Sequence, residues 1–244
     1  MNKIICLWSC PRNVSTSLMY SFGNRKDTAI FDEPLYAHYL IKSGLNHPGR
    51  DETLKTQENN GEKVIQDIIL KPIAKINFHK LMTHFLIDLD LDFLNKVTNV
   101  LFIRNPKNII NSYHKVIPFP SIDDIGIKKQ YDLFNHLKKN GKEAIVIDAK
   151  ELLKNPEAIL TTLCAKINIP FDRDMLSWEK GPKKEDGSWA KYWYTDTHNS
   201  TKFNQYIEKE IILTGRNIKL AQECEQYYDF LYSKSIKAKK PLTR

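Results

Sequence analysis

The chain has 244 residues, of which 41% are hydrophobic, and this is enough to bury a core within one globular domain. No stretch of the sequence reaches the roughly 18 apolar residues of a membrane-spanning helix, so we expect no membrane span. The apolar run at residues 4–8 is shorter than the roughly 7 residues that the core of a signal peptide needs, and no small-residue cleavage site follows it. We therefore interpret this run as the first strand of a cytoplasmic protein.

Positive charge is concentrated at the C-terminus. The formal net charge is +8, from 37 Lys and Arg against 29 Asp and Glu. Five positive charges lie near the end of the chain and leave +3 for the rest: Lys234, Lys237, Lys239, Lys240 and Arg244. We expect residues 233–244 to form a flexible basic tail, and we do not expect a nucleic-acid partner. The modest positive charge of the body suits an anionic small ligand.

The cysteines do not have the spacing of a metal site. Cys6, Cys10, Cys164 and Cys224 form no Cys-x-x-Cys pair and no zinc-type cluster with histidines. We expect reduced thiols and no bound metal.

Five short apolar segments alternate with amphipathic ones. The predicted strands are residues 4–8, 28–31, 73–78, 100–103 and 144–147, and their apolar or β-branched composition is typical of strands buried on both faces of a parallel sheet. The predicted helices are residues 15–22, 62–70, 106–115, 128–139 and 156–167. Asn105 and Asn155 are the expected N-caps before a proline at the first helical position. This alternation predicts an α/β fold of three layers, with a mostly parallel central sheet of about five strands, in a single domain over residues 1–244.

The last quarter of the chain has a different composition. Residues 171–205 are rich in Trp, Tyr, Lys and Gly and show no clear period, so we expect a long loop that covers a bound nucleotide or substrate. A closing helix is predicted from about residue 204 to residue 232.

The first strand leads into a predicted anion site, the run SCPRNVSTS at residues 9–17. A turn between a strand and a helix directs free backbone N–H groups and the positive end of the helix dipole toward the edge of the sheet. A guanidinium and three hydroxyls reinforce this, and the candidate binding residues are Arg12, Asn13, Val14, Ser15, Thr16 and Ser17. A capped helix that binds no ligand is an equally compatible interpretation of this run alone. The loop has no glycine and lacks the GxxxxGK[ST] pattern of nucleotide kinases.

A second cation is expected at the same edge of the sheet. Arg104 directly follows the fourth predicted strand, and Ser112 lies eight residues later, about two turns into the next helix. Because α/β proteins bind ligands at the carboxyl ends of their strands, this pair can hold a second anion. An NTPase that handles Mg²⁺ would need an acid at a strand end, whereas arginine suits anion binding without a metal.

These runs resemble the motifs of sulfotransferases that use 3′-phosphoadenylyl sulfate (PAPS). Residues 9–16 resemble the 5′-phosphosulfate loop of that family, and RNPK at residues 104–107 with Ser112 resembles its 3′-phosphate motif. The run KKEDGSW at residues 183–189 resembles the late basic loop that closes on the nucleotide. The likeness to bacterial sulfotransferase-like proteins extends to residues 32–36 and 189–194. The departures are Val14 in place of the family's glycine, Arg12 in place of its lysine, and extra acids in the last loop.

The resemblance implies a P-loop-like fold, PAPS as co-substrate, a small-molecule acceptor and no metal. In the late loop it implies nucleotide contacts from Lys183, Lys184, Gly187, Ser188 and Trp189. Sulfuryl transfer requires positioning and stabilisation of the charge that builds on the departing nucleotide, a role that suits Arg12 and the N–H groups of its loop.

The acceptor must lose a proton, and two residues are candidates for the base. Glu33 follows the second predicted strand, and the resemblance implies a catalytic glutamate there. His84 follows the third strand, near where the cytosolic branch of the family places a catalytic histidine. We favour Glu33, and Lys80 is the candidate that contacts the sulfonate. His79 is less suitable because strand alternation turns it away from Lys80.

Further residues are candidates for the acceptor pocket or for covering the adenine. Aromatic residues crowd the late loop: Trp178, Trp189, Tyr192, Trp193 and Tyr194. The candidate acceptor-pocket residues are Tyr36, His38, Tyr39, His47 and Arg50. Two alternatives to a PAPS-dependent sulfotransferase stay open, a P-loop-like nucleotide kinase or hydrolase and a non-catalytic nucleotide-binding homologue.

Overall fold

The computed structural model describes residues 2–113 and 119–237. Its centre is a sheet of five parallel strands in the order β2-β3-β1-β4-β5. The strands are β1 (Lys3–Ser9), β2 (Thr28–Asp32), β3 (Ile76–Met82), β4 (Thr98–Ile103) and β5 (Ala144–Asp148). The predicted α/β class and the parallel sheet of about five strands are confirmed.

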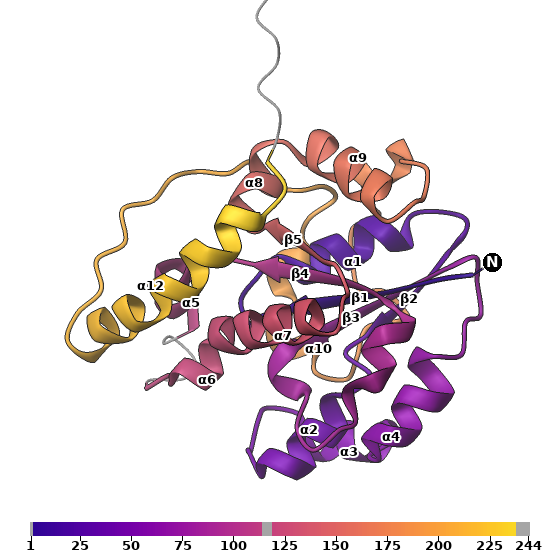
Figure 1. Ribbon diagram of the computed structural model, residues 1–244, viewed down its shortest axis with the longest axis horizontal. Coiled ribbons are helices and arrows are strands. Elements are labelled where there is room, and N and C mark those ends of the chain that lie inside the picture. The colour runs from indigo at the N-terminus through magenta and orange to yellow at the C-terminus, as the bar shows by residue number, and fades with distance from the viewer. Residues whose placement is uncertain (1, 114–118, 238–244) are drawn as a thin grey trace, which may run out of the picture.

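Helices cover both faces of this sheet, as Figure 1 shows. The helices are α1 (Ser15–Gly23), α2 (Tyr36–Ser43), α3 (Arg50–Thr56), α4 (Gly61–Val64), α5 (Pro106–Tyr113), α6 (Ile122–Ile125), α7 (Ile127–Lys139), α8 (Ala149–Lys154), α9 (Pro156–Lys166), α10 (Ala190–Trp193), α11 (Thr195–His198) and α12 (Arg216–Lys234). A π-helical turn at Ile65–Ile69 follows α4, and 3₁₀ turns lie at Thr83–Phe85, Leu91–Lys96 and Arg173–Leu176.

Strand alternation divides the core into two layers. On one face Leu7 and Phe102 pack with apolar residues of α1 and α9, and on the other Trp8 and Leu101 pack with residues of α2, α5, α7 and α12. The side chains of Leu7, Trp8, Leu101 and Phe102 are fully buried. The three layers predicted from the sequence are therefore present.

The third strand begins later than predicted. Residues 73–78 were the expected strand, but β3 runs over Ile76–Met82, and Ile73 is 72% exposed. The backbone N–H groups of Ile73 and Ala74 donate to the side chain of Asn77, which holds them in a turn before the strand. The shift places His79 and Lys80 within the strand.

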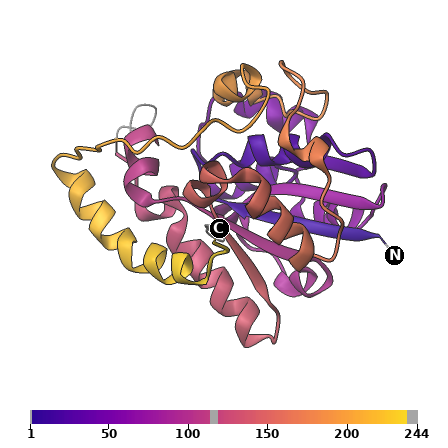
Figure 2. The same cartoon turned by 90° about the horizontal axis from the view of Figure 1, so that it is seen from above.

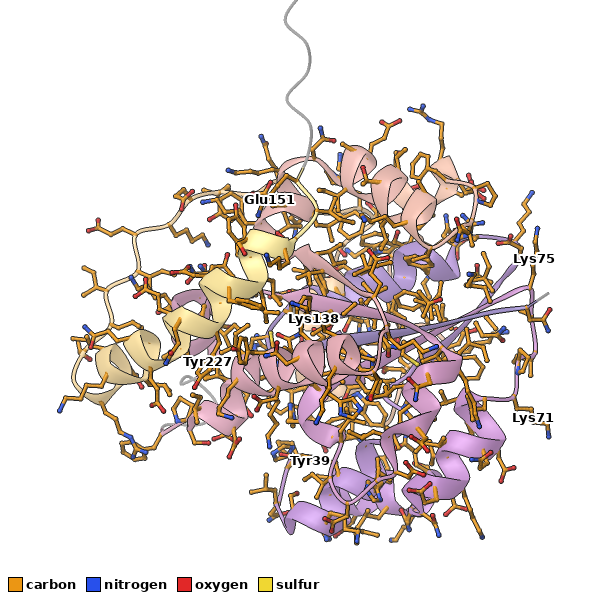
Figure 3. The ribbon with its side chains drawn as sticks, in the orientation of Figure 1. Tyr39, Lys71, Lys75, Lys138, Glu151 and Tyr227 are labelled. Carbon is orange, nitrogen blue, oxygen red and sulfur yellow. The ribbon has the colours of Figure 1, made fainter. Side chains whose placement is uncertain are left out.

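The closing helix also begins later than predicted, at Arg216. Residues 204–214 contain no helix or strand, and Gly215 at the start of α12 has a positive φ of 54°. Figure 2 shows this segment running away from the sheet to the start of α12. The helix then returns to the body, where Tyr232 donates a 2.6 Å hydrogen bond to Glu151, which is labelled in Figure 3.

The other predicted helices agree with the structure in their described parts, and Asn105 and Asn155 accept the expected capping hydrogen bonds. The last residues of the predicted helix at 106–115 and most of the predicted basic tail lie outside the described residues. No helix in the described part of the chain has both the length and the apolar character needed to cross a membrane.

Candidate active site

A cavity of about 830 Å³ opens at the carboxyl ends of the strands, where an α/β sheet is expected to bind its ligands. Its volume lies within the range of about 300–1,000 Å³ that is usual for small-molecule sites. The predicted site residues that line it are Arg12, Asn13, Val14, Ser15, Thr16, Ser17, Glu33, Lys80, His84, Arg104, Ser112 and Trp189. The structure thus brings together residues that are up to 177 positions apart in the sequence.

The loop between β1 and α1 is shaped to receive an anion. Arg12 has a left-handed backbone, with φ 55°, which costs a non-glycine residue about 1–2 kcal/mol. The Asn13 amide donates 2.8 Å to the carbonyl of Phe102 and accepts 2.9 Å from the N–H of Val14, which fixes the loop to β4. No described side chain caps α1, so the N–H groups of its first turn face the cavity without a side-chain acceptor.

The two arginines of the site meet beside this loop. The Arg12 Nε donates 3.1 Å to the Ser112 hydroxyl, and Arg104 donates from Nη1 to the Arg12 carbonyl. Among residues 2–113 and 119–237, no carboxylate lies within the 4.0 Å of an ion pair with either guanidinium. Two neighbouring cations without a counter-ion are expected to attract an anionic ligand.

The other side of the cavity holds a buried ion-pair cluster. The Lys80 Nζ lies 2.8 Å from Asp32 and 2.7 Å from Glu33, and all three side chains are at most 7% exposed. Register explains the contact, because Asp32 on β2 is directly opposite Lys80 on β3. The Tyr194 hydroxyl completes the cluster by accepting from Lys80 and from Trp189 Nε1 and donating to Asp32 at 2.9 Å.

Glu33 is the carboxylate of this cluster that lines the cavity. Its backbone is left-handed, with φ 46°, and is fixed by hydrogen bonds from its N–H to the Lys80 carbonyl and from the Tyr36 N–H to its own carbonyl. Burial raises the pKa of Glu33, Lys80 opposes this, and Asp32 adds to it, so that the net shift is upward. Burial lowers the pKa of Lys80, but its ion pairs with Asp32 and Glu33 outweigh that effect and raise it.

The two histidines near the third strand differ in their access to the cavity. His84 lines it from the 3₁₀ turn after β3, and burial lowers its pKa to about 3. His79 is fully buried and stacks on Phe31 at 4.3 Å between ring centroids, so it lies away from Lys80, as alternation predicted. Neither ring nitrogen of His79 has a partner among the described residues.

The sequence of the chain also matches a known protein family. The family model for a sulfotransferase domain matches residues 2–225. The chain belongs to the sulfotransferase domain family. In the described part of this sulfotransferase domain, no group of three His, Cys, Asp or Glu side chains is placed to hold a metal ion.

Solved sulfotransferases share the fold of this domain. The sulfotransferase domain from the curacin biosynthetic pathway superposes with a TM-score of 0.63 at 18% identity, over 95% of this chain and 98% of that one. A sulfotransferase from Alicyclobacillus acidocaldarius superposes with a TM-score of 0.52 at 10% identity, over 72% of this chain and 88% of that one.

Two curated relatives are longer proteins of Arabidopsis thaliana. They are named branched-chain-amino-acid aminotransferase-like protein 2 and protein 1, and are 38% and 42% identical to this chain. The matches cover 94% and 83% of the chain but only 41% and 37% of the relatives, so the sulfotransferase domain spans about two fifths of their length.

The late loop of the sulfotransferase domain reaches the cavity with its aromatic part. Trp189, Trp193 and Tyr194 line it, as do Asp196 to Ser200 in part and residues 203, 204 and 209–211. Trp178 instead packs on Phe203 in the core, and Tyr192 is 49% exposed.

The predicted basic part of this loop lies outside the cavity lining formed by the described residues. Lys183 is placed over the Tyr20 ring, 5.8 Å from its centroid, and the Lys184 side chain is 90% exposed beside Glu185. The Gly187 N–H donates 3.0 Å to Asp32, and Ser188 shares a 3.1 Å hydrogen bond with Thr53.

Only part of the expected acceptor pocket faces the cavity. Tyr36 and His47 line it and are joined by a 2.9 Å hydrogen bond between the Tyr36 hydroxyl and Nδ1 of His47. The other three candidates do not belong to its described lining: His38 bonds to the Ile87 carbonyl, Tyr39 packs on Phe85, and Arg50 pairs with Asp51. Further lining residues were not singled out from the sequence, namely Met82, Phe85 and Tyr113.

Two central contacts were missed from the sequence. In the sequence, Asp32 stands out only as part of residues 32–36, which resemble sulfotransferase-like proteins, and Tyr194 only as one of several aromatic residues. A polar residue at the end of a strand, directly before the candidate base, is the signal that points to Asp32. Nothing in the local sequence indicates that the Tyr194 hydroxyl meets it.

Proposed function

We propose that this sulfotransferase domain transfers the sulfuryl group of PAPS to a hydroxyl or amine of a small acceptor. The observation that carries the proposal is the shared cavity, in which two arginines that have no counter-ion among the described residues lie across from a buried Glu33–Lys80 pair. The arginines suit the two separate anionic groups of the donor, and the buried pair suits the reacting groups.

The donor would occupy the arginine side of the cavity. Arg12 and the N–H groups of the first turn of α1 would bind the 5′-phosphosulfate and stabilise the charge that develops on the bridging oxygen. Arg104 and Ser112 would bind the 3′-phosphate. No metal is invoked, because the transferred group carries less charge than a phosphoryl group and arginines supply the compensation. Trp189 lines the cavity, whereas nucleotide contacts from Lys183 and Lys184 stay a prediction.

The acceptor would occupy the side lined by aromatic and neutral groups. Tyr36, Phe85 and Tyr113 form this wall, and burial lowers the pKa of the adjoining His47. Such a wall favours an uncharged, flat or apolar acceptor over a highly charged one. Trp193 lies nearer the donor side, because the Arg12 guanidinium is 6.0 Å from the centroid of its ring.

Glu33 is the proposed base. Its raised pKa increases its affinity for the acceptor proton, and its side chain lines the cavity on a backbone held by hydrogen bonds to Lys80 and Tyr36. In the reaction, the acceptor oxygen or nitrogen bonds to sulfur as its proton passes to Glu33, and the bond from sulfur to the nucleotide phosphate oxygen breaks. The Lys80 ammonium lines the cavity but is already bonded to Asp32, Glu33 and Tyr194, so it would contact the transferred sulfonate by exchanging one of these partners. His84 is the alternative base, at the same cavity.

Nucleotide binding tests the donor assignment directly. We expect adenosine 3′,5′-bisphosphate to bind at least about tenfold more tightly than AMP in calorimetry, since a charge-assisted contact contributes about 1.5–3 kcal/mol. Arg104→Ala should remove most of this preference. Arg173→Ala, at an arginine whose side chain is 78% exposed, is the matched control and should leave it unchanged. Equal affinities of the two nucleotides would remove the second anion site.

Product formation tests catalysis. Labelled PAPS with a panel of alcohols, phenols, amines, sugars and peptides, analysed by mass spectrometry, should yield a sulfated product, with uncharged aromatic acceptors reacting best. Tight bisphosphate binding without any product would instead identify a non-catalytic nucleotide-binding homologue.

A further inference from the structure

Asp32 is a buried carboxylate to which the proposed reaction gives no role. Three donors converge on it: Lys80 at 2.8 Å, Tyr194 at 2.9 Å and the N–H of Gly187 at 3.0 Å. Its side chain is fully buried, whereas that of Glu33 is 7% exposed and lines the cavity. The two neighbouring carboxylates therefore have different environments, and Asp32 is the one that gathers the protein's own hydrogen bonds.

Lys80 has one more carboxylate than a single ion pair needs. If Glu33 takes the acceptor proton, it loses its negative charge, and Lys80 would then be a buried cation without a counter-ion. An uncompensated buried charge is strongly unfavourable. Asp32 keeps Lys80 paired after the proton has moved, so the cluster passes from one net negative charge to none instead of becoming positive.

Asp32 also connects this cluster to the late loop. The Gly187 N–H and the Tyr194 hydroxyl belong to the two ends of one turn of the chain, residues 187–194, and both bond to Asp32. The Trp189 indole within that turn donates 3.0 Å to the same Tyr194 hydroxyl. The turn therefore lies closed over Lys80 while these bonds hold.

We propose that Asp32 is a positioning residue for sulfuryl transfer: it keeps Lys80 paired when Glu33 gains the proton, and it holds residues 187–194 closed over the reacting pair. The first part rests on the proposed function, and the second part does not. Asp32 itself contacts no substrate and acts through Lys80, Gly187 and Tyr194.

The pH dependence of the reaction tests the first part. The titratable groups that act on Glu33 are Asp32 at the end of β2, Lys80 on β3, Tyr194 in the late loop and Tyr36 on α2. Asp32→Asn removes a like charge while Lys80 remains, so Glu33 should hold its proton less tightly. We expect the acidic limb of the kcat/KM profile to shift to lower pH by about one unit or more, and we expect kcat to be reduced.

Two controls separate this effect from a loss of structure. Asp88→Asn removes a carboxylate that is 68% exposed and should leave both the limb and kcat unchanged. A purely structural Asp32 would lower the rate at every pH without moving the limb, and that result would overturn the first part of the proposal.

Hydrogen–deuterium exchange tests the second part without any turnover. Exchange in residues 187–194 should become at least about tenfold faster in Asp32→Ala and in Tyr194→Phe, while exchange in α9 stays slow and shows that the fold is intact. Tyr192→Phe, at a half-exposed tyrosine of the same turn, is the matched control and should exchange like the wild type. Unchanged exchange in both test variants would overturn the second part.

The two measurements also distinguish the proposals from each other. If the wild type makes no sulfated product, the proposed function fails and the first part fails with it, whereas the exchange measurement still decides the second part. If product forms but neither the limb nor the exchange responds, the proposed function stands and the role of Asp32 is wrong.

Discussion

The cations on the two sides of the cavity have opposite environments. On one side, Arg12 and Arg104 have no ion-pair partner in the described part of the chain and bond to a hydroxyl and a carbonyl. On the other side, Lys80 is fully buried between two carboxylates. The arginine side is therefore incomplete without an anionic ligand, whereas the lysine side is assembled by the protein alone.

This difference indicates what each side contributes to transfer. The arginine side can gain most when charge develops on the departing nucleotide, because its donors are not already committed to a carboxylate. The lysine side has its groups fixed before a ligand arrives, so little reorganisation is needed at the moment of reaction. The arginine side is therefore ligand-completed, and the lysine side is preassembled.

The largest effect is expected from the proposed base. Glu33→Gln keeps the size of the side chain but cannot accept the proton, so kcat should fall by about 10²–10⁴-fold. Affinity for adenosine 3′,5′-bisphosphate, measured by calorimetry, should change little. Glu179→Gln, at a side chain that is 93% exposed, is the control. If Glu33→Gln keeps near wild-type turnover while a folded His84→Ala loses it, the two roles must be exchanged.

Stability should reveal the preassembled side. Lys80→Met leaves Asp32 and Glu33 buried without their cation, which is expected to cost about 3–5 kcal/mol. For a chain of this size, thermal unfolding should then occur roughly 6–20 °C lower. Lys42→Met is the matched control, because the Lys42 side chain is 40% exposed in its pair with Asp88. An unchanged melting temperature would contradict a closed buried cluster.

The ligand-completed side should respond in kinetics more than in stability. Arg12→Ala should lower kcat by about tenfold or more while weakening the desulfated nucleotide less, since its interaction grows as leaving-group charge develops. Arg104→Ala should show the reverse pattern, with weaker nucleotide binding and a smaller change in kcat. If Arg12→Ala weakens binding and leaves kcat intact, Arg12 is an anchor for the nucleotide and does not stabilise the transition state.

The sequence predicted well which residues lie at the ends of the strands. The ends of parallel strands meet at one edge of a sheet, and this rule correctly gathered Arg12, Glu33 and Arg104 from three separate strands. The apolar strands were located because local hydrophobicity determines them. The third strand was misplaced because its polar residues depend on contacts elsewhere in the chain: Lys80 pairs with Asp32, and the ring of His79 stacks on Phe31.

The missing parts of the site depend on contacts between distant segments. Asp32 meets Lys80 at a separation of 48 residues and Tyr194 at 162, and no local pattern encodes either meeting. Similarly, residue type alone predicts a limb of the kcat/KM profile near pH 6.5 for a histidine base and near 4.3 for a glutamate base. Burial changes this contrast, because it raises the pKa of Glu33 and lowers that of His84 to about 3.

The smallest effect concerns the stability of the fold in acid. Burial lowers the pKa of His79 to about 3, whereas an unfolded histidine titrates near 6.5. Below pH 6.5 the unfolded chain therefore binds a proton that the folded chain does not, and folding stability is lost as the pH falls from about 6.5 toward 3. Each such histidine adds a slope of about 1.4 kcal/mol per pH unit, and His84 should add a second one.

A histidine variant isolates this contribution. His79→Leu removes one protonation site from the interior, so the free energy of unfolding, measured in urea between pH 4.5 and 6.5, should depend less steeply on pH by about 1.4 kcal/mol per unit. Phe31→Leu replaces the ring that stacks on His79 but removes no protonation site, so it is the matched control for lost packing and should keep the wild-type slope. An unchanged slope in His79→Leu would show that His79 gains its proton in the folded state, and the stacking of its ring on Phe31 would then have to open in acid.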